Sequence, residues 1–246
     1  MHFVDSHVHL CEYPNRRSPL NQARFSGAIL ASSGIDKATS LATIAMARNE
    51  PAIVKAFVGV HPSAAQAPGD LEWFGGALRE ASGAGELGLD PRYSEVAPRT
   101  PQMIIFVQQL EAAEKEGKPV QVHSRGAEKE CLEVLSSYRL GNVLMHWFEG
   151  EGELGKASDE GFFFSFGPAI LYSKKLQRMA LSLDPKRVLA ESDGPVTFRP
   201  LGGAGGPALI PSVVFKLAEL WGVPFAEAGE RLWSNGLSFL GPVGKT

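Results

Sequence analysis

Three polar side chains interrupt an apolar run near the start of the sequence, in the stretch FVDSHVHL at residues 3–10. They are Asp5, His7 and His9, spaced two residues apart. On a β-strand, residues i and i+2 share a face, so these three side chains are expected to point the same way. Two imidazoles on one face can bind a single divalent metal ion. Asp5 would then orient one imidazole ring through a hydrogen bond.

Further metal-binding side chains occur in or at the ends of other short apolar runs. They are His61, Glu86, His123, His146 and Asp193. Even four of these five imidazoles with one Glu and one Asp are too many ligands for one tetrahedral ion. A site with two ions about 3.5–4 Å apart accommodates them. Such ions lower the pKa of bound water and hold the oxygens of a phosphoryl or carbonyl substrate, so the set indicates hydrolytic chemistry.

Eight short β-rich runs, bounded by Gly, Pro, Asn or charged residues, predict the strands that position these side chains. The predicted strands are residues 3–10, 27–33, 53–61, 83–90, 119–124, 142–148, 161–167 and 187–193. Apolar residues at helical spacing predict helices at 37–50, 70–81, 101–117, 128–138, 174–183, 211–222 and 226–240. The segment 202–207, GGAGGP, is expected to be a flexible loop.

Strands that alternate with helices over about 250 residues are typical of an α/β fold, the (β/α)8 TIM barrel. We therefore expect residues 1–246 to form a single metal-dependent hydrolase domain. An open doubly wound sheet is the alternative, but it favours a Gly-rich phosphate turn after the first strand, where this chain has His-Leu-Cys-Glu. In a barrel the strand ends meet at one rim, which is where barrel enzymes place their chemistry.

Each of these residues alone has an ordinary structural interpretation. A single His at a strand end is often a buried structural group, and Asp193 in SDGP fits a turn. Their joint placement at one rim favours a metal site. Cys11 is interpreted as a small buried apolar residue.

The overall composition excludes some classes of protein. Of the 246 residues, 44% are hydrophobic and 21% charged, and the net charge is −3, which gives no general attraction to nucleic acid or anionic membranes. A local patch or a bound metal could still attract an anion. Two cysteines without C-x-x-C spacing and no apparent signal peptide favour a cytoplasmic location. No apolar stretch reaches the roughly 18 residues of a membrane span.

Seven short motifs in a fixed order resemble the TatD family of metal-dependent hydrolases and deoxyribonucleases, within the amidohydrolase superfamily. They are DSHVHL (5–10), GVHP (59–62), GELGLD (85–90), PVQVHSRGA (119–127), HWFEG (146–150), ESDGP (191–195) and ERLWSNGLSFLG (230–241). The resemblance spans nearly the whole chain. It implies a (β/α)8 barrel that binds two divalent ions, with Zn, Mn, Mg, Fe or Co as candidates.

The resemblance also implies a role for each motif residue. His7 and His9 would hold the first ion together with Asp193. Glu86 would bridge both ions. Asp193 is far from His7 and His9 in the sequence, so only the fold could bring these three ligands together.

The remaining motif residues would complete the ligands of the second ion and form the substrate site. His123 and His146 would be the other ligands. Asp193 would orient or deprotonate the attacking water, so this carboxylate and the bridging Glu86 are the expected catalytic residues. His61 would contact a substrate phosphate without binding metal, and Arg125 would lie beside it.

Family members hydrolyse phosphodiesters in DNA, so the resemblance implies DNA or a small phosphodiester as substrate. Three places depart from the family pattern: Ser63 stands where many members have His, Glu149 where many have Thr or Ser, and 197–211 contains only Arg199 as a charged residue. These departures leave the metal set intact and alter the expected nucleic-acid contacts. Arg16 and Arg17 are interpreted as part of a solvated loop, with phosphate binding as the alternative.

Other functions are compatible with such a barrel. An amidohydrolase acting on a C–N or lactone bond often bridges its metals through a modified Lys on the fourth strand, and Glu86 stands there instead. A barrel that binds metal without turnover is the second alternative, and the complete ligand set disfavours it. Nucleic-acid binding without chemistry lacks the basic surface that it requires.

Overall fold

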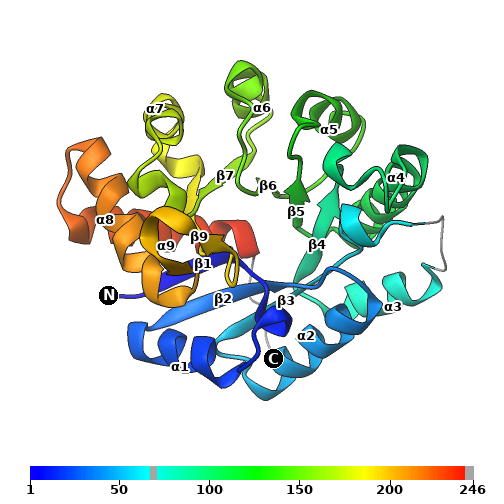
Figure 1. Cartoon of the computed structure of the whole chain (residues 1–246), viewed down its shortest axis with the longest axis horizontal. Helices are drawn as coiled ribbons and strands as arrows, with labels where there is room; N and C mark the ends of the chain where they lie inside the picture. Colours follow the sequence, from blue (N-terminus) through cyan, green and yellow to red (C-terminus); the bar gives the residue numbers. More distant parts are fainter. Residues whose placement is uncertain (67–70, 242–246) are drawn as a thin grey trace.

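Eight parallel strands pair in the order in which they follow along the chain and form a nearly closed barrel surrounded by helices (Figure 1). The computed structural model describes residues 1–66 and 71–241. The strands are β1 Phe3–Val8, β2 Ala28–Ser33, β3 Val54–Val58, β4 Gly83–Gly88, β5 Val120–His123, β6 Val143–Met145, β7 Phe163–Phe166 and β8 Val188–Ala190. All eight predicted strands and the TIM barrel are confirmed, and the open sheet is excluded.

The barrel closes where β8 meets β1. The Asp193 N–H donates to the carbonyl oxygen of His7 at 3.0 Å. The Asp5 carboxylate accepts hydrogen bonds from the N–H of Ser192 at 2.8 Å and from its hydroxyl at 2.6 Å. The expectation that Asp5 orients a histidine ring is therefore wrong. Asp5 instead ties the first strand to the segment that follows the last one.

Helices form the outer layer. They are α1 Arg17–Ser26, α2 Lys37–Asn49, α3 Glu72–Glu80, α4 Arg99–Glu116, α5 Glu128–Leu135, α6 Leu154–Asp159, α7 Lys174–Ser182, α8 Ile210–Trp221 and α9 Phe225–Leu240. The seven predicted helices are confirmed, although the predicted start of α3 at residue 70 lies outside the described residues. The structure adds α1 and α6, which the sequence did not indicate. Arg17 therefore begins a helix rather than lying in a loop.

The apolar core has two parts. The larger lies between the strands and the surrounding helices. The smaller fills the barrel interior. There, the ring of Phe239 of α9 stacks on Phe57, with centroids 5.7 Å apart, and meets Phe163 edge-on, with centroids 5.8 Å apart. The Asn142 side-chain amide at the start of β6 donates to the carbonyl oxygen of Phe239 at 3.0 Å. The last helix thus closes the end of the barrel at which the strands begin.

A short antiparallel hairpin follows β8. Its strands are β9 Thr197–Phe198 and β10 Gly203–Ala204, so part of the predicted loop at 202–207 is paired. Phe198 is buried and stacks on Trp147, with ring centroids 5.4 Å apart. This contact holds the hairpin against the segment that follows β6.

Helix length and hydropathy bear on membrane insertion. Within residues 1–66 and 71–241, no single helix is long and apolar enough to cross a bilayer. The segments Pro207–Trp221 and Phe225–Leu240 meet those criteria only as a pair, and they are bent by 111°. Both pack apolar residues into the core of the barrel.

Candidate metal centre

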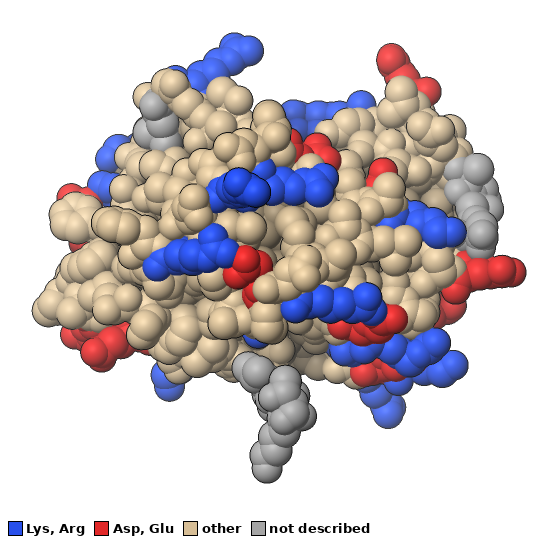
Figure 2. All heavy atoms as spheres, turned by 90° about the horizontal axis from the view of Figure 1, so that it is seen from below, with Lys and Arg blue, Asp and Glu red and all other residues tan. Residues whose placement is uncertain are grey.

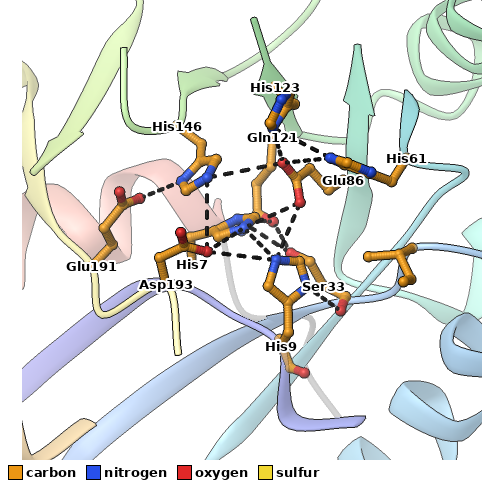
Figure 3. Close-up of polar contacts among 12 residues, drawn as sticks. His7, His9, Ser33, His61, Glu86, Gln121, His123, His146, Glu191 and Asp193 are labelled. Atoms are coloured by element: carbon orange, nitrogen blue, oxygen red, sulfur yellow. Dashed lines mark hydrogen bonds and ion pairs between the residues drawn. The ribbon is translucent and has the colours of Figure 1, made fainter. Parts of the chain in front are cut away.

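The six side chains expected to bind metal converge at the carboxyl ends of the strands, where Figure 3 shows them pointing toward one another. They are His7, His9, Glu86, His123, His146 and Asp193. Their ligand atoms, with those of His61, form three overlapping groups within 4.8 Å: His7 with His146 and Asp193, His7 with His9 and Glu86, and His61 with Glu86 and His123. One mostly buried cluster therefore contains every predicted ligand.

His7 and His9 face each other with their Nε2 atoms 3.1 Å apart. The Nδ1 atom of His9 lies 3.3 Å from the Ser33 carbonyl oxygen, which can only accept, so Nδ1 carries the proton. The Nδ1 atom of His7 lies 3.2 Å from the Gln121 Oε1 atom. The Gln121 amide nitrogen donates to the carbonyl oxygen of Ser6, which fixes that orientation. Both rings therefore direct Nε2 toward the centre (Figure 3).

Glu86, from β4, lies between the histidines. Its Oε2 atom is 3.4 Å from Nε2 of His7 and 3.2 Å from Nε2 of His9. Its Oε1 atom is 2.6 Å from Nδ1 of His123 and 3.6 Å from Nε2 of His61. Burial alone would raise the pKa of Glu86, but the surrounding histidines outweigh it and hold that pKa well below its usual value. The two carboxylate oxygens thus face different histidine groups.

Asp193 follows β8 in a left-handed backbone conformation, with φ of +46°. A non-glycine residue in this region is strained, and such strain clusters at functional sites. The conformation brings Oδ1 to 3.7 Å from Nε2 of His7 and 3.6 Å from Nε2 of His9. Burial raises the pKa of this carboxyl well above its usual value.

His146 is held from behind by a second carboxylate. Its Nδ1 atom lies 2.7 Å from Oε2 of Glu191, which is fully buried and also accepts from Ser165. Burial raises the pKa of Glu191 to about 7. The ring of His146 stacks on that of His7, with centroids 3.7 Å apart. The ring centroids of His146 and His123 are 6.3 Å apart. The assignment of His146 to the same ion as His123 stays a prediction.

This donor set fits divalent cations. Two imidazole Nε2 atoms 3.1 Å apart and two carboxylates share one buried space. A cation would accept these lone pairs together, and imidazole with carboxylate is a usual ligand set for Zn, Mn, Fe and Co. The residues from β1, β4, β5, β6 and β8 would hold it.

His61 lies beside the centre, and its hydrogen bonds distinguish it from the ligands. Its Nδ1 atom accepts from the N–H of Ser63 at 3.1 Å. A backbone N–H can only donate, so the neutral ring carries its proton on Nε2, which faces Glu86 and His123. Burial lowers the pKa of His61 to about 3, so the ring is neutral near pH 7. This favours a hydrogen-bond donor over a ligand.

A cavity of about 550 Å³ opens over the cluster. Both predicted substrate-binding residues, His61 and Arg125, line it. Arg125 is about a third exposed and its guanidinium is bound to Asp90 through Nε at 2.8 Å and Nη2 at 2.6 Å. Other lining side chains are Glu12, Ser63, Arg92, Tyr93, Trp147, Glu149 and Val196. The cavity thus combines both signs of charge with aromatic surface.

Comparison with known proteins identifies the family. A family model described as TatD related DNase matches residues 4–241. The chain belongs to the TatD family. It is 26% identical over 248 residues to an uncharacterized metal-dependent hydrolase of Haemophilus influenzae, in a match that covers 96% of this chain and 98% of that protein. This member of the TatD family is therefore a metal-dependent hydrolase.

The chain also resembles a human protein over part of its length and a solved bacterial structure over nearly all of it. Human deoxyribonuclease TATDN3 is 30% identical over 115 residues, which is 45% of this chain and 42% of the human protein. The solved structure of YJJV, a TatD homologue of Escherichia coli K12, superposes with a TM-score of 0.87 at 23% identity and covers 96% of this chain and 97% of that one. The second likeness supports the fold.

Several side chains at the centre were not singled out from the sequence. Gln121 lies two residues before His123 on the same strand, and Asp90 lies four after Glu86, so alternation along a strand was a usable signal for both. Ser33 acts through its carbonyl oxygen, which no residue type reveals. Trp147 became visible only through its position in the cavity.

Proposed function

We propose that this TatD-family protein is a two-metal hydrolase of phosphodiester bonds, with DNA ends or small phosphodiesters as substrates. The observation that carries the proposal is Glu86, whose two oxygens face separate histidine groups as a bridging carboxylate would. The overlap of the three candidate ligand groups at His7 and Glu86 supports two adjacent ions rather than one. The deoxyribonuclease name of the human relative supports the substrate class.

Divalent ions bound here would lower the pKa of a water molecule and polarise phosphoryl oxygens. Asp193 is placed to accept a proton, since its carboxylate lines the cavity and is held against the cluster by its backbone. His61 offers an N–H to a phosphoryl oxygen. Arg125 also lines the cavity, and both it and His61 lie beside the Tyr93 ring, so its positive charge would orient an anionic substrate.

Charge at the cavity mouth bears on substrate size. Glu149 and Glu12 line the cavity together with Arg92 and Arg125, so the rim is not uniformly basic. Away from the cavity, on the side where α1 and α2 lie in Figure 1, Figure 2 shows Lys and Arg interspersed with Asp and Glu. Among the outer helices, Arg24 pairs with Glu50 and Arg48 with Glu80. Long duplexes favour a continuous basic surface, so short or single-stranded ends are the better expectation.

The test is hydrolysis by the Mn- or Zn-loaded protein of bis(4-nitrophenyl) phosphate, end-labelled single-stranded DNA and a small lactone. Substitution Asp193→Asn should lower kcat/KM on the phosphodiesters by about 10²–10⁴, the usual contribution of a general base. Asp159→Asn, an exposed carboxylate at the end of α6, is the matched control and should keep full activity. Lactone turnover alone would replace the proposal with an amidohydrolase activity, and metal binding without any turnover would reject it.

A further inference from the structure

Asp90 is a buried carboxylate just after β4 that contacts two functional side chains at once. Its Oδ2 atom lies 2.9 Å from Nε2 of His123 and also accepts from Nε and Nη2 of Arg125 at 2.8 and 2.6 Å. Its Oδ1 atom accepts from the N–H of Arg92 at 2.8 Å. Asp90 itself is 0% exposed, so its carboxylate is shielded from water.

The backbone of Asp90 is fixed by a buried side chain of α4. The Gln102 amide accepts from the Asp90 N–H at 2.9 Å and donates to the Asp90 carbonyl oxygen at 3.0 Å. It also donates to the Ala97 carbonyl oxygen at 2.7 Å. Because Gln102 is 1% exposed, the carboxylate is held in place by an element outside the metal centre.

This contact determines which nitrogen His123 can offer. An ionised carboxylate only accepts hydrogen bonds, so Nε2 of His123 carries a proton. The other nitrogen, Nδ1, faces Glu86 at 2.6 Å. In His9 and His146 the arrangement is reversed: Nδ1 meets the Ser33 carbonyl oxygen or the Glu191 carboxylate, and Nε2 faces the centre.

We propose that Asp90 is a positioning residue that fixes His123 as an Nδ1 ligand and, through the same oxygen, fixes the guanidinium of Arg125 over the cavity. The metal centre then contains one histidine that binds through Nδ1 and three that bind through Nε2. The role of Asp90 toward His123 depends only on metal binding. The role of Arg125 toward an anionic substrate rests on the proposed function.

The direct test is long-range ¹H–¹⁵N spectroscopy of ¹⁵N-histidine-labelled protein loaded with ¹¹³Cd. The expected result is coupling of ¹¹³Cd to Nδ1 of His123, with a proton on its Nε2, and coupling to Nε2 of His7, His9 and His146. Coupling through Nε2 of His123, or no coupling to His123, would overturn the inference. This readout needs no substitution and no substrate.

Two substitutions separate the functions of Asp90. Asp90→Asn replaces an acceptor shared by His123 and Arg125, so metal affinity measured by chelator competition should fall about 10–100-fold, the usual effect of losing an outer hydrogen-bond partner of a ligand. Arg125→Gln should leave metal affinity and the His123 coupling unchanged and should raise KM for an anionic substrate. Unchanged metal affinity in the Asp90→Asn protein would contradict the positioning role.

A control distinguishes positioning from a general structural effect. Asp184→Asn removes a carboxylate that accepts from the N–H of Lys186 at 2.9 Å, before β8 and away from the rim. It should leave metal affinity and the ¹¹³Cd couplings as in the parent protein. If the spectra match expectation while no phosphodiester is cleaved, the inference stands and the proposed function fails.

Discussion

At the scale of single residues, the histidines of the metal centre divide by what surrounds them. Burial lowers the pKa of His7 to about 4 and that of His146 to about 3, so both rings are neutral at pH 7. Burial acts in the same direction on His9, but Glu86 outweighs it and raises that pKa to about 9. For His123, Asp90 and Glu86 together outweigh burial and raise the pKa to about 9. Two rings therefore carry an extra proton without metal.

Metal uptake at pH 7 should release those protons, because a metal ion binds only the unprotonated nitrogen. Titration calorimetry in buffers of different protonation enthalpy should show release of about two protons from His9 and His123 at pH 7. The release should fall toward zero as pH rises above 9. Binding with no buffer dependence would contradict this assignment.

The same pKa values set a stability trend for the metal-free protein. A group whose folded-state pKa is raised stabilises the fold below its unfolded pKa, here 6.5, and this stabilisation is lost as pH rises through about 9. Unfolding in urea with chelator should therefore show the His9 and His123 contribution disappear between pH 6.5 and 9. Metal-loaded protein should not show that loss.

Residue types and spacing predicted that the candidate ligands converge, because each lies in a strand or within a few residues of its end, and strand ends in a barrel meet. Asp5 shows where this reasoning stops. Alternation predicted that it shares a face with His7, but the register of β1 shifts between Asp5 and Val8, and the carboxylate contacts Ser192 instead. The expected contact of Arg125 with substrate stays a prediction, and the structure shows that Asp90 binds its guanidinium.

At the scale of elements, the spacing between β4 and β5 determines whether Glu86 can reach His123. Gly88 makes this spacing possible. Its φ is +144°, and a Cβ atom there would lie 1.9 Å from the carbonyl oxygen of His123. Both the backbone conformation and the close approach require glycine at this position.

Gly88→Ala should therefore destabilise the protein by at least about 1–3 kcal/mol, the range for a strained backbone, and should also weaken metal binding. Gly76→Ala is the matched control, since Gly76 lies in α3 and a Cβ atom added there would meet nothing within 4 Å. It should be neutral or stabilise by about 0.5–1 kcal/mol. Urea unfolding and chelator competition measure the two effects, and equal behaviour of both variants would refute the role of Gly88.

The elements that the sequence did not indicate lack the signals on which prediction depends. In α1 only Pro19 and Ala23 are buried and Phe25 is 96% exposed, so the apolar stripe is too short to indicate a helix. In α6, six residues bury only Leu154 and Ala157. Both helices owe their conformation to the barrel surface beneath them rather than to local pattern.

At the scale of the whole molecule, the two ends of the barrel have different contents. The metal centre lies at the carboxyl ends of the strands, and α9 fills the opposite end with Phe239. Asn235 of the same helix donates to the Val188 carbonyl oxygen at 2.8 Å, at the start of β8. The candidate metal centre and the apolar packing around Phe239 therefore lie at opposite ends of the barrel.

Phe239→Ala should lower the free energy of unfolding by about 3–5 kcal/mol, because it removes a fully buried ring from the barrel interior. Metal content per folded molecule should stay unchanged. Phe25→Ala, at a ring that is 96% exposed, is the matched control and should change stability by less than about 0.5 kcal/mol. A small effect at Phe239, or loss of metal with the fold intact, would contradict the separation.

The closure of the barrel by Asp5 and Ser192 joins positions 187 residues apart in the chain. His7 emerges early during synthesis and must wait for Asp193 before both can meet, and contacts of such long sequence separation form slowly. A nascent polypeptide therefore gains the complete set of candidate metal ligands only after the segment that follows β8 has docked against β1.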